Sequence, residues 1–347
     1  MNTSIELGVD TFGDVAAHAD GTEMTPGETL RAIVDEAVMA DRVGVDFFGL
    51  GEHHRADYAV SAPDVVLAAI GARTEQIHVT SAVTVLSSDD PVRVYERFAT
   101  LQGLTDGRAE IIVGRGAYTE SFPLFGLSLE RYEELFEDRL SLFAKTLTGT
   151  PVTWSGSTRT SLKNQSLHPA VDAPLPAWIG VGGSPDSITR AAKYGLPVVM
   201  AIIGGTPERF ALMTDLHRRT LTEHGHGSKP IGVHSPGYIA DTDEQAREEF
   251  WPHYSEVMNR LARERGFMPT SRDRYEAETR GGALMVGSPE TVAPRIVHTL
   301  KTLGASRFSM KYSSGHMPHD LALRSIELYG REVAPRVREI MNLDAAN

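Results

Sequence analysis

The chain has 347 residues, enough for two average domains or for one large α/β barrel. With 34 Lys and Arg against 46 Asp and Glu, its formal net charge is −12, which argues against nucleic acid or an anionic membrane as the main partner. The sequence contains no cysteine, which excludes disulfides, thiolate metal sites and a cysteine nucleophile. It has no long apolar run and no secretory leader pattern at its start, so we expect a cytoplasmic protein.

Short apolar segments alternate with segments of helical periodicity along the chain. The expected strands are residues 4–10, 46–51, 77–86, 109–113, 176–181, 196–202, 231–239 and 306–310. The expected helices are residues 27–43, 62–73, 91–104, 129–147, 184–194, 207–223, 242–265 and 319–341. Each return to a parallel strand needs a crossover, so this alternation predicts parallel strands.

Eight strand–helix units predict a (β/α)8 TIM barrel, an α/β fold in which residues 1–347 form one domain. A doubly wound open sheet is the alternative, and the count and even spacing of the strands favour the barrel. Two segments interrupt the alternation. Residues 150–175 form a polar insertion that suits a small hairpin, and residues 265–288 are highly charged and are expected to form a long loop.

Unusual residues follow three of the expected strands, where a TIM barrel carries its active site. They are Glu52-His53-His54, Gly114-Arg115-Gly116 and Gly182-Gly183-Ser184. The three groups come from separate units of the barrel, and we therefore expect them to meet at one rim.

Residues 182–187 have the features of a phosphate seat. Gly182 and Gly183 let the backbone approach an anion, free N–H groups begin the next helix, and Ser184 and Ser187 add hydroxyl donors. The alternative is a plain helix cap at Ser184. Arg115 follows a buried strand and needs a partner, which could be the same phosphate or a carboxylate of a neighbouring loop.

The histidines do not form a convincing metal site. His53 and His54 are adjacent on an extended segment, so their side chains point in opposite directions, and we expect no metal. We expect His217, His224 and His226 to be solvated surface residues, because they lie in or after a helix far from the rim. No dinucleotide fingerprint or Walker motif is present.

In this order, several motifs resemble the bacterial luciferase-like family of flavin-dependent monooxygenases. They are EHH after the second strand, VTSAVTVL in the third, DPVR, DGR, GRG, GGSPDSITRAAKYGLPV, GSPETVAPRI and the C-terminal MPHDLALRSIELYGREVAPRVREI. The combination covers nearly the whole chain.

This resemblance implies a barrel that binds FMN, with a deazaflavin as the alternative cofactor. It places the phosphate on Arg115, Gly183, Ser184 and Ser187, with Gly182 in the same turn, and assigns His53 a role in acid–base chemistry. It also implies a non-proline cis peptide between Ala82 and Val83, beneath the flavin ring. Arg131 is a further candidate for the phosphate. Gly114 stands where luciferase has a reactive cysteine, so light emission is not implied.

The function implied is that of an FMN-dependent monooxygenase, which uses reduced FMN as a co-substrate and O2 on a small organic substrate. Such enzymes act on paired donors and incorporate molecular oxygen. The alternatives are a deazaflavin-dependent dehydrogenase on the same fold and a non-catalytic flavin-binding protein. A separate flavin reductase and a homodimer, paired through residues 62–70 and 91–101, are also expected, as is a lid formed by residues 265–288 that excludes water.

Overall fold

The computed structural model describes residues 5–116, 118–149 and 151–346. Eight parallel strands close into a barrel: β1 (Glu6–Thr11), β2 (Phe47–Leu50), β3 (His78–Ser81), β5 (Ala109–Gly114), β8 (Ala177–Val181), β9 (Val198–Ala201), β10 (Ile231–Ile239) and β12 (Arg307–Lys311). They pair in the order β12-β1-β2-β3-β5-β8-β9-β10, and β10 pairs with β12 to close the ring. The predicted TIM barrel is therefore confirmed, with all eight expected strands in it. Ser4, where the first expected strand begins, lies outside the described residues.

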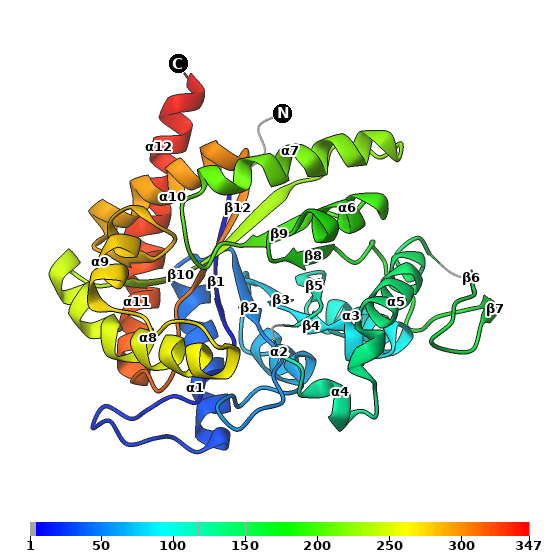
Figure 1. The fold of residues 1–347 in the computed structure, drawn as a ribbon, viewed down its shortest axis with the longest axis horizontal. Coiled ribbons are helices and arrows are strands. Elements are labelled where there is room, and N and C mark those ends of the chain that lie inside the picture. Colours follow the sequence, from blue (N-terminus) through cyan, green and yellow to red (C-terminus); the bar gives the residue numbers. More distant parts are fainter. Residues whose placement is uncertain (1–4, 117, 150, 347) are drawn as a thin grey trace.

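Helices surround the barrel (Figure 1). They are α1 (Pro26–Arg42), α2 (Pro63–Gly71), α3 (Pro91–Leu104), α4 (Ser121–Leu124), α5 (Tyr132–Thr146), α6 (Pro185–Lys193), α7 (Glu208–Glu223), α8 (Asp243–Arg265), α9 (Arg272–Gly281), α10 (Pro289–Leu303), α11 (His319–Leu328) and α12 (Ala334–Ala346). Short 3₁₀ turns at Leu86–Ser88 and Leu129–Arg131 precede α3 and α5, and a π-helical turn at Tyr329–Val333 joins α11 to α12. The last expected helix, residues 319–341, is thus two helices with a π turn between them.

Local sequence signals explain where several helices begin. Thr25 and Glu28 form a capping box at α1, in which each side chain bonds the other residue's backbone N–H. Ser184 caps α6, and Pro185 occupies the first helical position, where no backbone donor is needed. None of the helices in the described ranges combines the length and apolarity needed to cross a bilayer.

The expected third strand, residues 77–86, is divided in two. β3 ends at Ser81, the Ala82–Val83 peptide is cis, and β4 (Thr84–Val85) then pairs with the end of β5. The cis bond lies where it was predicted. The interruption turns the chain at the carboxyl end of the barrel, beside the candidate site.

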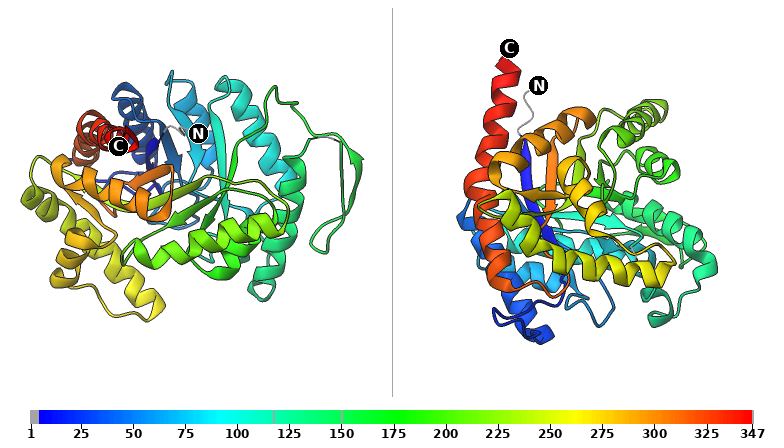
Figure 2. Two further views of the ribbon diagram at one scale, coloured as in Figure 1. Left: turned by 90° about the horizontal axis from the view of Figure 1, so that it is seen from above. Right: turned by 60° about the vertical axis from the view of Figure 1, so that its left-hand side comes forward.

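The polar insertion forms a hairpin, as its composition suggested. β6 (Val152–Trp154) and β7 (Leu162–Gln165) pair antiparallel and project beyond α5 (Figures 1 and 2). Trp154 is buried, and its indole Nε1 donates to Ser141 Oγ of α5 at 2.8 Å. This hydrogen bond holds the hairpin against α5. Thr150, at the start of the insertion, lies outside the described residues.

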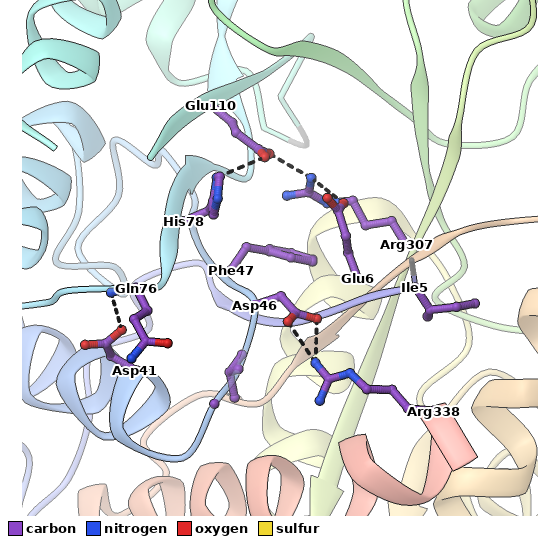
Figure 3. Close-up of a pocket in the computed structure, with 12 residues that line it drawn as sticks. Ile5, Glu6, Asp41, Asp46, Phe47, Gln76, His78, Glu110, Arg307 and Arg338 are labelled. Atoms are coloured by element: carbon purple, nitrogen blue, oxygen red, sulfur yellow. Dashed lines mark hydrogen bonds and ion pairs between the residues drawn. The ribbon is translucent and has the colours of Figure 1, made fainter. Parts of the chain in front are cut away.

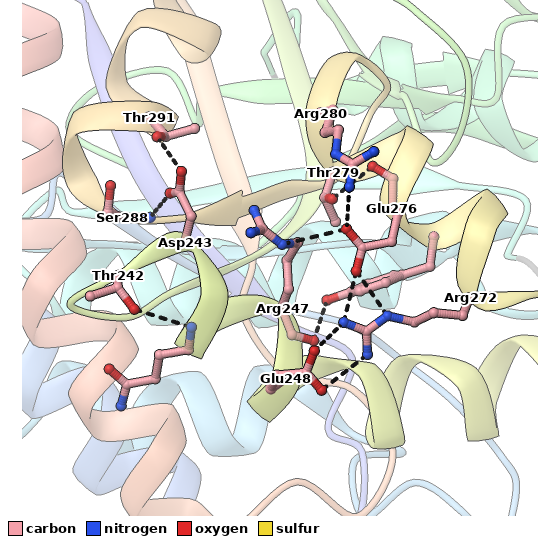
Figure 4. A network of polar contacts seen from close by, with 12 residues as sticks. Thr242, Asp243, Arg247, Glu248, Arg272, Glu276, Thr279, Arg280, Ser288 and Thr291 are labelled. Atoms are coloured by element: carbon pink, nitrogen blue, oxygen red, sulfur yellow. Dashed lines mark hydrogen bonds and ion pairs between the residues drawn. The ribbon is translucent and has the colours of Figure 1, made fainter.

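The expectation of a continuous long loop at residues 265–288 is wrong. This segment contains α9 and β11 (Met285–Gly287), which pairs with β10 outside the barrel ring. Tyr275 is fully buried against Trp251 and Tyr254 of α8, with ring centroids 5.0 and 5.4 Å away. Arg272 joins the helices by pairing with Glu248 and Glu276 (Figure 4). The charged residues therefore face one another or solvent, while one aromatic side chain anchors the helix.

α10, which precedes β12, was also missing from the predicted elements. Its apolar face was readable at Val292, Ile296, Leu300 and Leu303, all buried, but Pro294 interrupts the pattern of helix-forming residues. The structure accommodates this proline in the second turn, where its missing N–H leaves one i→i−4 hydrogen bond of α10 unmade. The prediction for His217 was wrong as well: it is fully buried on α7, with Nε2 3.1 Å from Leu196 O.

A buried guanidinium occupies the amino-terminal end of the barrel interior. The Arg307 side chain is 2% exposed and lies over the rings of Phe47 and Trp178, at 3.7 and 4.9 Å from their centroids. Its Nη1 lies 2.7 Å from Glu110 and 3.1 Å from Glu6 (Figure 3). Burial alone would raise the pKa of Glu110, but Arg307 and His78 outweigh this effect and hold the pKa below its usual value. A charged cavity of about 460 Å³ opens at this end.

Candidate active site

A second cavity, of about 360 Å³, opens at the carboxyl end of the barrel. It exists because many inward-facing positions there carry little or no side chain. Gly114 and Gly180 are two of them, and Val83 packs between them: a Cβ added at either glycine would lie 2.7 Å from a Val83 methyl group. Val83, Ile112 and Val199 make an apolar surface over Trp178. These three side chains form the apolar floor of an open cavity, and we call this floor the apolar bed.

The cavity brings together most of the predicted site residues. His53, Ala82, Val83, Arg115, Gly182 and Ser187 line it directly. Gly183 and Ser184 do not line it but form the turn that positions Ser187. Gly183 has φ of +84°, a conformation that favours glycine. Arg131 is not among the lining residues and pairs with Glu134 on the surface.

Arg115 meets the start of α6 at one side of the cavity. Its Nη2 donates to Ser187 Oγ at 3.0 Å, and the hydroxyls of Ser184 and Ser187 are 2.8 Å apart. The Ser184 hydroxyl also accepts from the Ser187 backbone N–H, so the cap and the candidate phosphate seat are one structure. A guanidinium, two hydroxyls and a helix N-terminus together make a site suited to an anion.

The alternative partner of Arg115, a carboxylate, is present too. Arg115 Nη1 pairs with Glu133 of α5, and Glu133 also pairs with Arg190 of α6 at 2.7 Å. Arg190 further contacts Glu137 at 2.9 Å, and its Nη1 is buried without a hydrogen bond among the described residues. Glu133 is 61% exposed, so it can leave Arg115 for solvent when another anion arrives.

His53 also lines the cavity and is buried. Its Nδ1 is 3.2 Å from Phe12 O, and its ring stacks on Tyr58 with centroids 4.1 Å apart. Because a carbonyl oxygen only accepts, Nδ1 carries the proton and Nε2 is left as an acceptor. Desolvation by burial lowers the pKa of His53 to about 4. The imidazole is therefore neutral at neutral pH, unlike the ordinary titrating histidine that the sequence suggested.

Glu52 and His54, the neighbours of His53, have structural roles. Glu52 accepts from the Val85 backbone N–H at 2.9 Å and from His54 Nε2 at 3.0 Å. It therefore links the loop after β2 to β4, directly after the cis peptide. This link helps to position the segment that carries Val83.

Three polar residues on the barrel strands that line the cavity were missed by sequence reasoning. Asp10 on β1, His234 on β10 and Ser309 on β12 all line the cavity. Their only sequence signal is a polar residue inside an apolar strand pattern, as in IGVHSPGYI, which a buried structural residue would produce equally well. Their proximity depends on barrel closure, which brings β10, β12 and β1 side by side.

Residues 8–307 match the luciferase-like monooxygenase family. The chain belongs to this family and is therefore an oxidoreductase. Limonene 1,2-monooxygenase of Rhodococcus erythropolis is 25% identical over 304 residues, which cover 85% of this chain and 78% of that protein.

Solved structures share the whole barrel. The monooxygenase RslO1 from Streptomyces bottropensis has a TM-score of 0.82 at 21% identity, covering 95% of this chain and 99% of its own. The oxygenating constituent of 3,6-diketocamphane monooxygenase from Pseudomonas putida, in complex with FMN, has a TM-score of 0.74 at 19% identity. The coenzyme F420-dependent tetrahydromethanopterin reductase from Methanopyrus kandleri has a TM-score of 0.70 at 17% identity. The last two each cover 96% of this chain and 99% of their own.

The lowered pKa of His53 predicts a specific loss of stability in acid. In the unfolded chain His53 takes up a proton near pH 6.5, whereas in the folded protein it does so only near pH 4. The free energy of unfolding should therefore fall as pH falls through this range, by up to about 3 kcal/mol. Urea unfolding of wild type and His53→Phe measures the effect, because only wild type should show this component. Parallel pH dependences for the two proteins would contradict the prediction.

Proposed function

We propose that the protein is an FMN-dependent monooxygenase that uses reduced FMN and O2 to oxidise a small organic substrate. The observation that carries the proposal is the presence, in one cavity, of an anion seat at Arg115 and Ser187 and a small-residue apolar bed at Val83. A phosphate joined to a flat, largely apolar ring system matches both features. The FMN complex of the related 3,6-diketocamphane enzyme supports this choice.

The residues present fit FMN. Arg115, Ser184, Ser187 and the backbone of the Gly182–Gly183 turn would hold the phosphate, while Ala82 and Val83 would support the ring. Reduced FMN supplies electrons to O2 when it is bound. The apolar lining at Ile112 and Val199 keeps water away from the reacting atoms. The neutral His53 would accept a hydrogen bond at Nε2, since its Nδ1 is committed to Phe12 O.

A separate flavin reductase would supply the reduced cofactor, because the sequence has no nicotinamide fingerprint.

A deazaflavin-dependent dehydrogenase is the second candidate function, favoured by the likeness to the F420-dependent reductase. A flavin-binding protein without turnover is the remaining alternative. Binding assays with FMN and F420, followed by turnover with and without O2, separate the three. The proposal requires FMN binding and an O2-dependent product.

The phosphate seat is tested by removing its charge. Arg115→Ala should weaken FMN binding about ten- to a hundred-fold, or about 1.5–3 kcal/mol, because it removes a charge-assisted contact. Riboflavin, which lacks the phosphate, should bind both proteins equally. Fluorescence titration measures each affinity.

Arg73→Ala is the matched control, since it removes an exposed arginine paired with Asp35 on another part of the surface. Glu133→Gln should leave FMN affinity unchanged or raise it, because it removes the competing carboxylate. Equal FMN affinity of wild type and Arg115→Ala would rule out the seat.

We propose that the lid is formed by the end of α8 and the link that follows it, residues 266–268. Arg55, in the loop after β2, pairs with Glu264 at 2.6 Å and with Glu120 beyond β5, which holds α8 to the rim. Phe267 and Met268 follow, 66% and 82% exposed. This link, rather than the anchored α9, would close over the cavity when substrate binds.

Replacing Phe267 and Met268 together by Ser should raise the hydrogen peroxide released per reduced FMN, because a less apolar lid admits water. FMN affinity should stay within about twofold. Leu212→Ser, at an exposed position of α7, is the control. Peroxide yields that match wild type in the double variant would refute the lid.

A homodimer through α2 and α3 is also proposed. Val65 of α2 and Leu104 at the end of α3 are 66% and 67% exposed, and the two helices pack side by side. Light scattering should give about twice the 37.8 kDa chain mass. Val65→Asp should shift the mass toward one chain, because a charge would be buried, and Leu212→Asp should not. A mass near 38 kDa for wild type at micromolar concentration would exclude this assembly.

A further inference from the structure

The cavity has a polar wall opposite Arg115, and the proposed function assigns this wall no role beyond His53. It comes from three neighbouring strands: Asp10 on β1, Ser309 on β12 and His234 on β10. His234 and Ser309 are direct partners across β10 and β12. Asp10 is 1% exposed and His234 is 7% exposed.

Hydrogen bonds determine which atoms of His234 are donors. Its Nδ1 is 3.0 Å from Asp10 Oδ1, and Ser309 Oγ donates to the same carboxylate oxygen. A carboxylate oxygen only accepts, so Nδ1 carries a proton, and in the neutral imidazole Nε2 is an acceptor. The ring lies parallel to Phe12, with centroids 5.6 Å apart and planes at 4°, which fixes its orientation.

A second histidine also contacts Phe12. His53 lies 5.2 Å from the Phe12 ring and binds the Phe12 carbonyl through Nδ1, so its Nε2 is an acceptor as well. In addition, Asp10 Oδ2 is buried and has no hydrogen-bond partner among the described residues. The wall thus presents two acceptors to the cavity, Nε2 of His234 and Nε2 of His53. Its donors, the two Nδ1 atoms and the Ser309 hydroxyl, are already used, and Asp10 Oδ2 is enclosed by protein.

A buried acceptor that lacks a donor is unfavourable, so a ligand that fills this wall should bring donors with it. We infer that Asp10, His234 and Ser309 form a subsite for a hydroxyl or N–H group of the substrate, with His234 Nε2 as the accepting atom. This inference rests on the proposed function for the identity of the cofactor, and it adds the substrate class. The substrate is a small, mainly apolar molecule that bears a hydroxyl or N–H group, such as a phenol or an alcohol.

The arrangement also explains the division of the cavity. Donors gather at Arg115 and Ser187, after β5 and β8, and acceptors gather at β1, β10 and β12 across the barrel. Val83, Ile112 and Val199 form the apolar part of the same cavity. An anionic cofactor and a donor-bearing substrate would therefore bind at different sides without competing for the same groups.

Phenol and toluene test the inference, because they have similar shapes and differ in one donor. Calorimetric titration of the FMN-loaded protein gives the ratio of the toluene to the phenol dissociation constant. This ratio should fall about tenfold in His234→Phe, which keeps a ring against Phe12 but removes the acceptor. Ile203→Ala, at an exposed apolar position of the lining, should weaken both probes alike.

A measurement on wild-type protein does not depend on the folding of any variant. In ¹⁵N-histidine-labelled protein, one imidazole held by Asp10 should show an unprotonated Nε2 whose resonance moves on addition of phenol and not of toluene. Asp10→Asn should abolish this response.

Two results would overturn the inference. The first is an unchanged probe ratio in a folded His234→Phe protein. The second is a tenfold loss of FMN affinity in that variant, which would assign the wall to the cofactor. If the protein fails to bind FMN but the ligand-free protein still shows a His234-dependent preference for phenol, the subsite stands and the proposed cofactor is wrong.

Discussion

The contact of Val83 with Gly114 and Gly180 is the constraint on which the candidate site depends. A closed barrel of eight strands normally fills its interior with side chains. Here several positions near the carboxyl ends of the strands, among them Gly114 and Gly180 beside Val83, carry no side chain, and the space becomes a cavity. A single methyl group added at Gly114 or Gly180 would have to displace Val83 and so change the floor of the site. Glu52 holds the same segment from the other side, through the Val85 backbone.

The amino-terminal end of the barrel interior holds charged and aromatic side chains. Arg307, Phe47 and Trp178 fill the interior, and Glu110 and Glu6 provide the charge that a buried guanidinium requires. Trp178 also supports Ile112 and Val199, which line the upper cavity. The buried ion pair therefore lies directly beneath the apolar bed. The barrel therefore has a charged cavity at its amino-terminal end and a largely apolar cavity at its carboxyl end.

Arg115 shows how a binding group can be held ready before its ligand arrives. Ser187 and Glu133 keep the guanidinium at the cavity edge, and Glu133 and Glu137 share Arg190 behind it. The carboxylate partner and the phosphate seat looked like competing interpretations of one arginine. In the folded protein they are compatible, because Glu133 is largely exposed and can release Arg115 at little cost.

The sequence by itself determined the class of fold and the rim that carries the site. Apolar period and turn residues are local properties, so all eight barrel strands, the hairpin and the grouping of His53, Arg115 and Ser187 at one rim were predictable. Local pattern failed where contacts across the fold decide the outcome. α9 is highly charged and is anchored by Tyr275, and α10 contains Pro294. His217 is buried and bonds the backbone oxygen of Leu196, in the connection before β9.

Only the tertiary structure decided the chemistry of the cavity walls. Asp10 and His234 are 224 residues apart, and only barrel closure brings them into contact. The burial that lowers the pKa of His53 likewise comes from Phe12, Tyr58 and their neighbours, not from the EHH motif. Protonation and hydrogen-bond direction depend on desolvation and on partners distant in the chain, and these exist only after the barrel has closed.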